Sequence, residues 1–146
     1  MRREEVKALI DQAQPLALNG AALAGVDLSE LRLDAADLSY AVLDGALLRR
    51  CQLRRAILWA ASARRCDFSG ADLQGAQLST ADLSQALLCG ADLRGATLQG
   101  TNLHLADLRG ADLRDTTPDA SLCRGVRADA GTRWPLGWAG TTSDHE

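Results

Sequence analysis

The chain of 146 residues has few aromatic side chains, only 3% of the total, and no long apolar run. Its hydrophobic content is mostly Ala and Leu, which fits a narrow, regular core of small and uniform side chains. No stretch approaches the roughly 20 apolar residues of a membrane-spanning helix. The first residues, Met-Arg-Arg-Glu-Glu, lack the apolar run of a signal peptide. We therefore expect one soluble, cytoplasmic domain that does not associate with a membrane.

Cysteine and histidine are also sparse, and their spacing excludes the common metal sites. The four cysteines are Cys51, Cys66, Cys89 and Cys123. No two of them form a Cys-x-x-Cys pair, and His104 and His145 stand far from any cysteine cluster. We predict no metal and no cofactor, and we interpret the cysteines as free thiols that behave as small hydrophobic residues.

The motifs of catalysis are missing as well. The sequence has no Gly-rich phosphate loop and no pairing of a nucleophile with a base, and His104 stands alone near Asp107. An enzyme needs a pocket in which reactive groups converge, and a narrow filled core offers none. We therefore expect neither enzymatic activity nor a small-molecule substrate.

What the sequence does contain is a five-residue repeat from Leu18 to Leu113. Of the twenty positions taken at steps of five, eighteen are Leu, and the exceptions are Ala63 and Phe68. The residue two places earlier is small, and it is Ala at fourteen of the twenty places. A period of five matches neither a helix nor a strand. It is typical of a solenoid, in which each unit buries its apolar side against its neighbours.

Segments such as 71–75 and 91–95, Ala-Asp-Leu-Gln-Gly and Ala-Asp-Leu-Arg-Gly, resemble the A-(D/N)-L-x-x unit of the pentapeptide-repeat family. The resemblance covers about two thirds of the chain, and the ending from Thr132 to Gly137 is similar to the tails of cyanobacterial members. It implies an all-β solenoid, a right-handed quadrilateral β-helix with four pentads in each coil. Residues 16–115 would form about five coils, with leucines twenty residues apart stacked inside at ~4.8 Å per coil.

Two flanking segments lack the repeat. Residues 1–15 carry Val6, Leu9 and Ile10 at helical spacing and end at Pro15, which predicts a short α-helix. A solenoid needs its open end covered, so we interpret this helix as a cap, with a docking helix as the alternative. After Leu113 the pattern fails, because Pro118 stands where the next leucine belongs.

Residues 116–146 are therefore expected to form an irregular tail, partly packed on the end or side of the solenoid. Its large apolar residues are Trp134, Leu136 and Trp138. They would cover the last coil or its side, or form a dimer contact. We expect the last residues, Thr141 to Glu146, to be disordered.

The repeat is least regular near Ala63, where a leucine is expected. The loss of most of a side chain predicts a small cavity or a local narrowing, partly filled by neighbours such as Phe68. On this basis we expect Ala63→Leu to be tolerated or stabilising.

Function would have to lie on the outer surface, where two clusters stand out. The first is a belt of arginines within nearly one coil: Arg49, Arg50, Arg54, Arg55, Arg64 and Arg65. Such a belt would recruit an anion, an acidic protein or nucleic acid, or it would face Asp34, Asp44 and Asp67 of adjoining coils as a solvated surface.

The second cluster is apolar. Tyr40, Ile57 and Trp59 occupy outward positions on one face of the predicted solenoid. Exposed apolar residues that gather in this way indicate an interaction site, unless the tail folds back over them.

Some members of the family resemble duplex DNA and engage DNA gyrase through a broadly acidic surface. The repeat region of this chain has ten Arg against twelve Asp or Glu, a balance of −2. Duplex DNA of a comparable length carries about fourteen charges. Asp72, Asp92 and Asp112 do form one column, but Arg94 and Arg114 stand close enough to neutralise part of it.

The leading hypothesis is a non-catalytic scaffold that binds a protein partner, as a monomer or a dimer. The alternative is a role linked to nucleic acid, through the arginine belt or through a topoisomerase.

Overall fold

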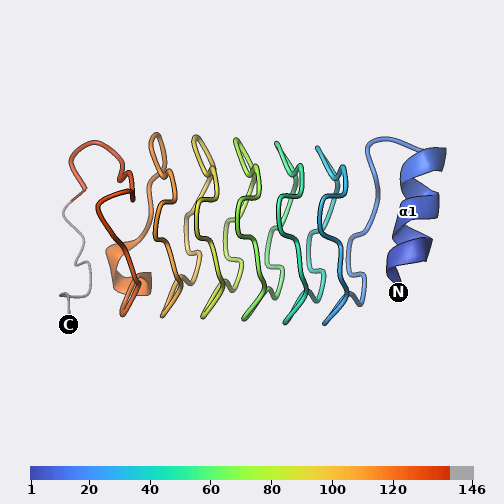
Figure 1. Cartoon of the computed structure of the whole chain (residues 1–146), viewed down its shortest axis with the longest axis horizontal. Coiled ribbons are helices and arrows are strands. Elements are labelled where there is room, and N and C mark those ends of the chain that lie inside the picture. The colour runs from blue at the N-terminus through green and yellow to red at the C-terminus, as the bar shows by residue number, and fades with distance from the viewer. Residues whose placement is uncertain (139–146) are drawn as a thin grey trace.

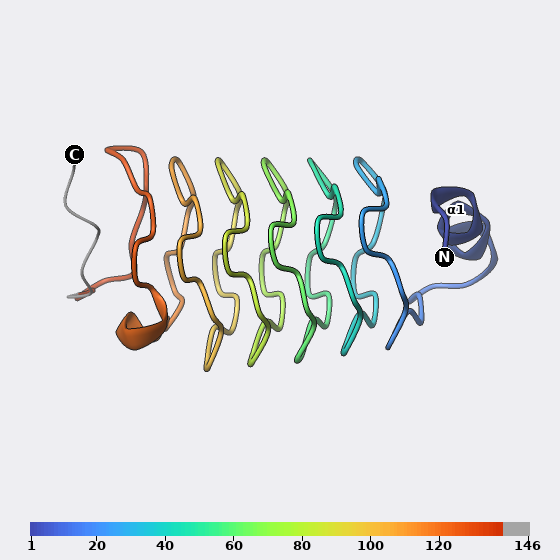
Figure 2. The ribbon, with the colours of Figure 1, turned by 90° about the horizontal axis from the view of Figure 1, so that it is seen from below.

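The computed structural model describes residues 1–138, apart from the side chain of Ser121. The chain winds into a column of stacked coils, with α1 (Arg3–Gln12) at one end and η1 (Ala120–Leu122) near the other. Figures 1 and 2 show the coils side by side along the length of the molecule. Within residues 1–138, no helix is long and apolar enough to cross a membrane.

The coils are joined by isolated parallel bridges between residues twenty apart, from Ala17–Asp37 to Asp92–Asp112. The backbone hydrogen bonds follow the same register, as when the N–H of Leu73 donates to the carbonyl of Asp92 over 2.7 Å. Four pentads therefore make one coil. The expectation that leucines twenty residues apart share one wall is confirmed, and these leucines are buried.

A tight turn closes each pentad, and its second residue lies at a corner of the coil. In one example, the N–H of Ala76 donates to the carbonyl of Leu73 over 3.0 Å, and Gly75 at the corner has φ +66°. Glycine adopts this left-handed conformation without steric cost. Of the twenty corners between residues 20 and 115, nine are Gly and eleven are other residues.

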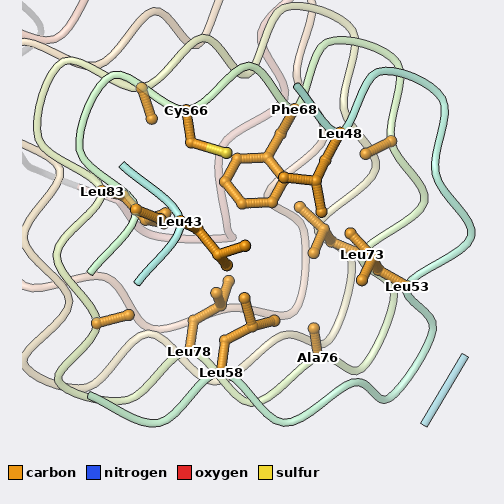
Figure 3. Packing of buried hydrophobic residues seen from close by; sticks show 14 of the residues in the cluster. Leu43, Leu48, Leu53, Leu58, Cys66, Phe68, Leu73, Ala76, Leu78 and Leu83 are labelled. Atoms are coloured by element: carbon orange, nitrogen blue, oxygen red, sulfur yellow. The ribbon is translucent and has the colours of Figure 1, made fainter. Parts of the chain in front are cut away.

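The interior of the column departs from uniform leucine stacking at Ala63 and Phe68, both fully buried. In Figure 3 the ring of Phe68 lies between Cys66 and Leu48 and points toward the middle of the shaft. Phe68 belongs to the pentad that follows Ala63, and both side chains point into the shaft. We therefore expect the ring to take up space that a leucine at 63 would need, which revises our expectation for Ala63→Leu.

We predict that Ala63→Leu lowers the free energy of unfolding by about 1–3 kcal/mol, because it overpacks the wall beside Phe68. Phe68→Leu alone should also destabilise, because it leaves a cavity. The double variant, with leucine on both walls, should recover to within about 1 kcal/mol of the wild type. Urea unfolding of all four proteins gives the coupling energy. Additive losses in the double variant would show that the two side chains do not share one space.

The N-terminal end of the column is closed by α1. The helix buries Val6, which is 0% exposed, while Leu9 and Ile10 pack against the core. Nη1 of Arg3 donates to the carbonyls of Asp27 (2.8 Å) and Ser29 (3.2 Å). In later coils the equivalent carbonyls accept hydrogen bonds from N–H groups of the preceding coil. The first coil has no preceding coil to donate to its carbonyls. Arg3 thus supplies donors that an earlier coil would otherwise provide.

The C-terminal end continues past the expected limit at residue 115. The N–H groups of Leu108 and Leu113 donate to the carbonyls of Arg127 and Arg133, each over 2.7 Å. The bridge Asp112–Arg133 spans 21 residues instead of twenty, so the last coil contains one extra residue. Oδ1 of Asp129 accepts from the N–H of Gly110 over 2.9 Å, in the place of a backbone carbonyl. A partial further coil therefore covers the last regular one.

The aromatic part of the tail lies at this same end. Trp134 and Trp138 stack with ring centroids 5.3 Å apart and pack against the core, whereas the side chain of Leu136 points into solvent. Figure 1 shows this segment, in red, at the end of the column opposite to α1. The disorder expected for Thr141 to Glu146 falls outside the described residues.

We predict that Arg3→Ala lowers the free energy of unfolding by about 1 kcal/mol, because two edge carbonyls lose a charged donor. Arg2→Ala is a matched control, since Arg2 pairs only with Glu5 in an exposed position. Its effect should stay within about 0.5 kcal/mol. Equal losses for the two variants in urea unfolding would exclude a specific role of Arg3 at the edge.

Candidate interaction surface

A tryptophan, a tyrosine and two aliphatic side chains lie at one corner of the column, which we call the Trp59 corner (Tyr40, Val42, Ile57 and Trp59), while Leu87 and Leu105 are exposed elsewhere on the column. Tyr40 is 67% exposed, Trp59 is 50% exposed and Val42 is 41% exposed, while Ile57 is half-buried. The carbonyl of Trp59 accepts from the N–H of Tyr40 over 2.8 Å, so these two residues lie on adjacent coils. Val42 was not among the residues predicted from the sequence, although its outward position two residues after Tyr40 places it here.

The fold does not require the aromatic ring of Trp59. The equivalent turn positions one coil before and one coil after are Ser39 and Ser79, and the same ladder passes through all three turns. The described part of the tail, residues 116–138, does not cover the ring, because it lies at the C-terminal end of the column (Figure 2). Within residues 1–138, the apolar corner is open to solvent.

The six arginines of the belt divide into two sets according to their place in the turn. The first set precedes the corner and pairs with aspartates: Arg49–Asp67 at 2.5 Å, Arg54–Asp72 at 2.6 Å and Arg64–Asp44 at 3.0 Å. Asp44 and Asp67 thus neutralise arginines, as the solvated alternative expects, whereas Asp34 accepts from the backbone N–H of Arg54. This set is held against the wall of the column.

The pKa values of these aspartates reflect the pairing. Burial opposes the ionisation of Asp67, but hydrogen bonds from Ser69 and Arg49 outweigh it and lower its pKa. Burial likewise opposes the ionisation of Asp44, and hydrogen bonds from Arg64 and Ser62 lower its pKa. Both carboxylates are thus charged at neutral pH and balance the arginines beside them.

The second set, Arg50, Arg55 and Arg65, lies at the corners themselves and is exposed. Arg50 approaches Glu30 of the preceding coil at 3.4 Å. Arg55 and Arg65 form no ion pair or side-chain hydrogen bond with any residue between 1 and 138. These two guanidinium groups are therefore available to a partner.

The order of the corners decides which arginines share a surface with Trp59. Corners 50, 55, 60 and 65 follow one another around a single coil, and Trp59 immediately precedes the corner at Ala60. Arg55 and Arg65 consequently occupy the two corners next to the Trp59 corner, while Arg50 occupies the opposite one. The structure does not bring the six arginines together on one face.

The acidic columns are neutralised in the same manner. Asp92, Asp107 and Asp112 each pair with the arginine two residues later, at 2.6–2.7 Å. The hydrogen bond from Arg109 lowers the pKa of Asp107 to about 2, although burial opposes this shift. Each of these carboxylates carries its own counter-charge, so the columns do not form the uncompensated acidic stripe that imitation of duplex DNA requires.

The remaining polar and thiol groups are spread over the column. Burial raises the pKa of the Cys51 thiol to about 11, and its Sγ donates to the carbonyl of Leu28 over 2.9 Å.

Among residues 1–138, no three His, Cys, Asp or Glu side chains are arranged to hold a metal ion. The surface hollow beside α1 is lined by Ile10, Asp11, Gln14, Arg32 and Asp34.

Comparison with known proteins agrees with this geometry. The family model of pentapeptide repeats matches residues 18–55, 46–85 and 77–115, with eight copies of the repeat. The chain belongs to the pentapeptide-repeat family. A pentapeptide-repeat protein of the Arabidopsis thaliana thylakoid lumen is 26% identical, with a TM-score of 0.57 over 83% of this chain and 86% of that one. The family fold is the right-handed quadrilateral β-helix.

Two cyanobacterial pentapeptide-repeat proteins of known structure are also similar to the chain. Rfr23 from Cyanothece 51142 is 28% identical, with a TM-score of 0.49 over 89% of this chain and 99% of that one. A protein from Nostoc Pcc 7120 is 33% identical, with a TM-score of 0.38 over 91% of this chain and 87% of that one. A comparison with curated protein sequences found no match.

Arg55 and Gly95 occupy the same corner on different coils, with φ near +60°. Substitutions at these two positions measure the conformational cost of a side chain there. Arg55→Gly should raise the free energy of unfolding by up to about 1 kcal/mol, because relief of left-handed strain exceeds the added entropy of glycine in the unfolded chain. Gly95→Ala, two coils later, should lower it by about 1 kcal/mol. A Cβ atom at Gly95 would have no atom within 4 Å, so only the backbone conformation opposes it. Urea unfolding that shows no change for Gly95→Ala would contradict this account.

Proposed function

We propose that this pentapeptide-repeat protein is a non-catalytic scaffold that binds a partner protein through the Trp59 corner. The observation that carries the proposal is the exposed tryptophan, which the fold does not need and which lies beside Tyr40 and Val42. Tryptophan and tyrosine are enriched among the residues that dominate the energy of protein interfaces. The expected cytoplasmic location and the choice between monomer and dimer stay predictions.

The architecture supports such a role. Because the inward residues and the backbone ladder hold the column together, the outward residues can vary without loss of the fold. A partner therefore meets a rigid surface, whose side chains lose little further conformational freedom on binding.

The charges disfavour the alternative role linked to nucleic acid. Three of the six belt arginines are held by aspartates, and the other three lie at three different corners of the coil. Duplex DNA binding depends on several cations that reach phosphates along one face. We therefore do not propose a nucleic-acid role.

We predict that Trp59→Ser abolishes capture of the specific partner without loss of stability, since Ser39 and Ser79 already occupy this column. Proteins captured from lysate by the wild type are identified by mass spectrometry, and the affinity of the purified partner is then measured. Its Kd should rise by at least about 30-fold, as for an interface tryptophan whose loss costs 2 kcal/mol or more.

Leu105→Gln is the matched control for this experiment. Leu105 is 47% exposed on a different corner, and Gln85 occupies the same corner one coil earlier. The control variant should capture the partner as the wild type does. A partner that binds wild type and Trp59→Ser equally would refute binding through this corner.

A further inference from the structure

We infer that the segment bound at the Trp59 corner is acidic on both sides of a large apolar side chain and runs around the coil rather than along the column. The inference rests on the proposed function and specifies the chemistry of the partner. It follows from the position of Arg55 and Arg65, from their lack of an ion pair within residues 1–138, and from the carboxylates nearby.

The two arginines occur only on the coil that carries Trp59. In the column of Arg55, the corners before and after are Ala35 and Gly75; in that of Arg65, they are Gly45 and Gln85. The coil with the exposed tryptophan is therefore the one that carries arginine at both neighbouring corners. Neither guanidinium is compensated within residues 1–138, so carboxylates of a partner would supply the missing counter-charges.

The backbone conformation at these corners does not favour arginine, although the aliphatic stem of Arg55 lies over Gly75 of the next coil. Arg55 and Arg65 have φ +56° and +55°, a conformation in which glycine is less costly than any residue with a Cβ atom. The next coil uses Gly75 at the corner of Arg55. The lack of an ion pair within residues 1–138, rather than the corner conformation, points to a role of these two side chains in recognition.

The direction of the bound segment follows from the acids around the corner. Asp37 lies one coil before Ile57, and Asp82 lies one coil after Ser62. Both carboxylates accept from nearby serine N–H groups but form no ion pair within residues 1–138. A segment that ran along the column would bring its own acids against them. A segment that crosses the corner within one coil meets Arg55, then Trp59 with Tyr40, then Arg65, in the order basic, apolar, basic.

Selection from a random-peptide library on the immobilised full chain tests this inference. We expect the enriched peptides to carry Asp or Glu on both sides of an aromatic or large aliphatic residue. The Kd of a labelled enriched peptide is then measured for each variant by fluorescence polarisation. The double variant Arg55→Gly/Arg65→Gln, which takes its residues from the next coil, should weaken binding about tenfold. Raising NaCl from about 50 to about 500 mM should weaken wild-type binding as well.

Arg50→Gly is the matched control, because Arg50 lies at the opposite corner and Gly70 occupies that column one coil later. It should leave the affinity unchanged. If Trp59→Ser abolishes peptide binding while the double arginine variant does not weaken it, the acidic partner is refuted and the Trp59 corner stands. If neither change matters, both proposals fail. Enrichment of basic or uncharged peptides, enrichment of none, or preferential binding of a labelled DNA duplex would also overturn the inference.

Discussion

The whole molecule depends on one constraint, the return of the chain to the same wall after twenty residues. This register aligns the backbone N–H and carbonyl groups of successive coils and stacks the leucines in the same step. Hydrogen bonding and apolar burial thus require the same period, and a sequence that satisfies one satisfies the other. Three of every five residues face outward or lie in turns, where they are free to serve recognition.

The position of an arginine within the turn decides whether it pairs with an aspartate of this chain or stays unpaired within residues 1–138. An arginine that precedes the corner lies along the wall and reaches an aspartate one coil away, as Arg54 reaches Asp72. An arginine at the corner is exposed and, in the case of Arg55, forms no ion pair within residues 1–138. Two adjacent residues of the same kind therefore have different environments, and a count of the charges in the belt overstates what a partner can contact.

The sequence predicted the parts of this structure that the period controls. The stacked columns and a short helix within residues 1–15 follow from spacing, and aspartates of adjoining coils that face the arginine belt were one of two alternatives. Features that depend on side-chain conformation were not predictable in this way. The coil beyond residue 115 uses the carboxylate of Asp129 where the repeat uses a carbonyl, and the ring of Phe68 points toward the middle of the shaft. The availability of Arg55 and Arg65 likewise depends on which acids their side chains fail to reach.

The two ends of the column have a consequence for assembly. An unprotected edge of a ladder is a template on which a second molecule can add, coil upon coil, into a fibre. Here the edge carbonyls at one end accept from Arg3, and the edge N–H of Gly110 at the other donates to Asp129. An incoming chain would have to displace a charged group at either terminus. Arg3 and Asp129 therefore disfavour end-to-end addition of a second molecule at these groups.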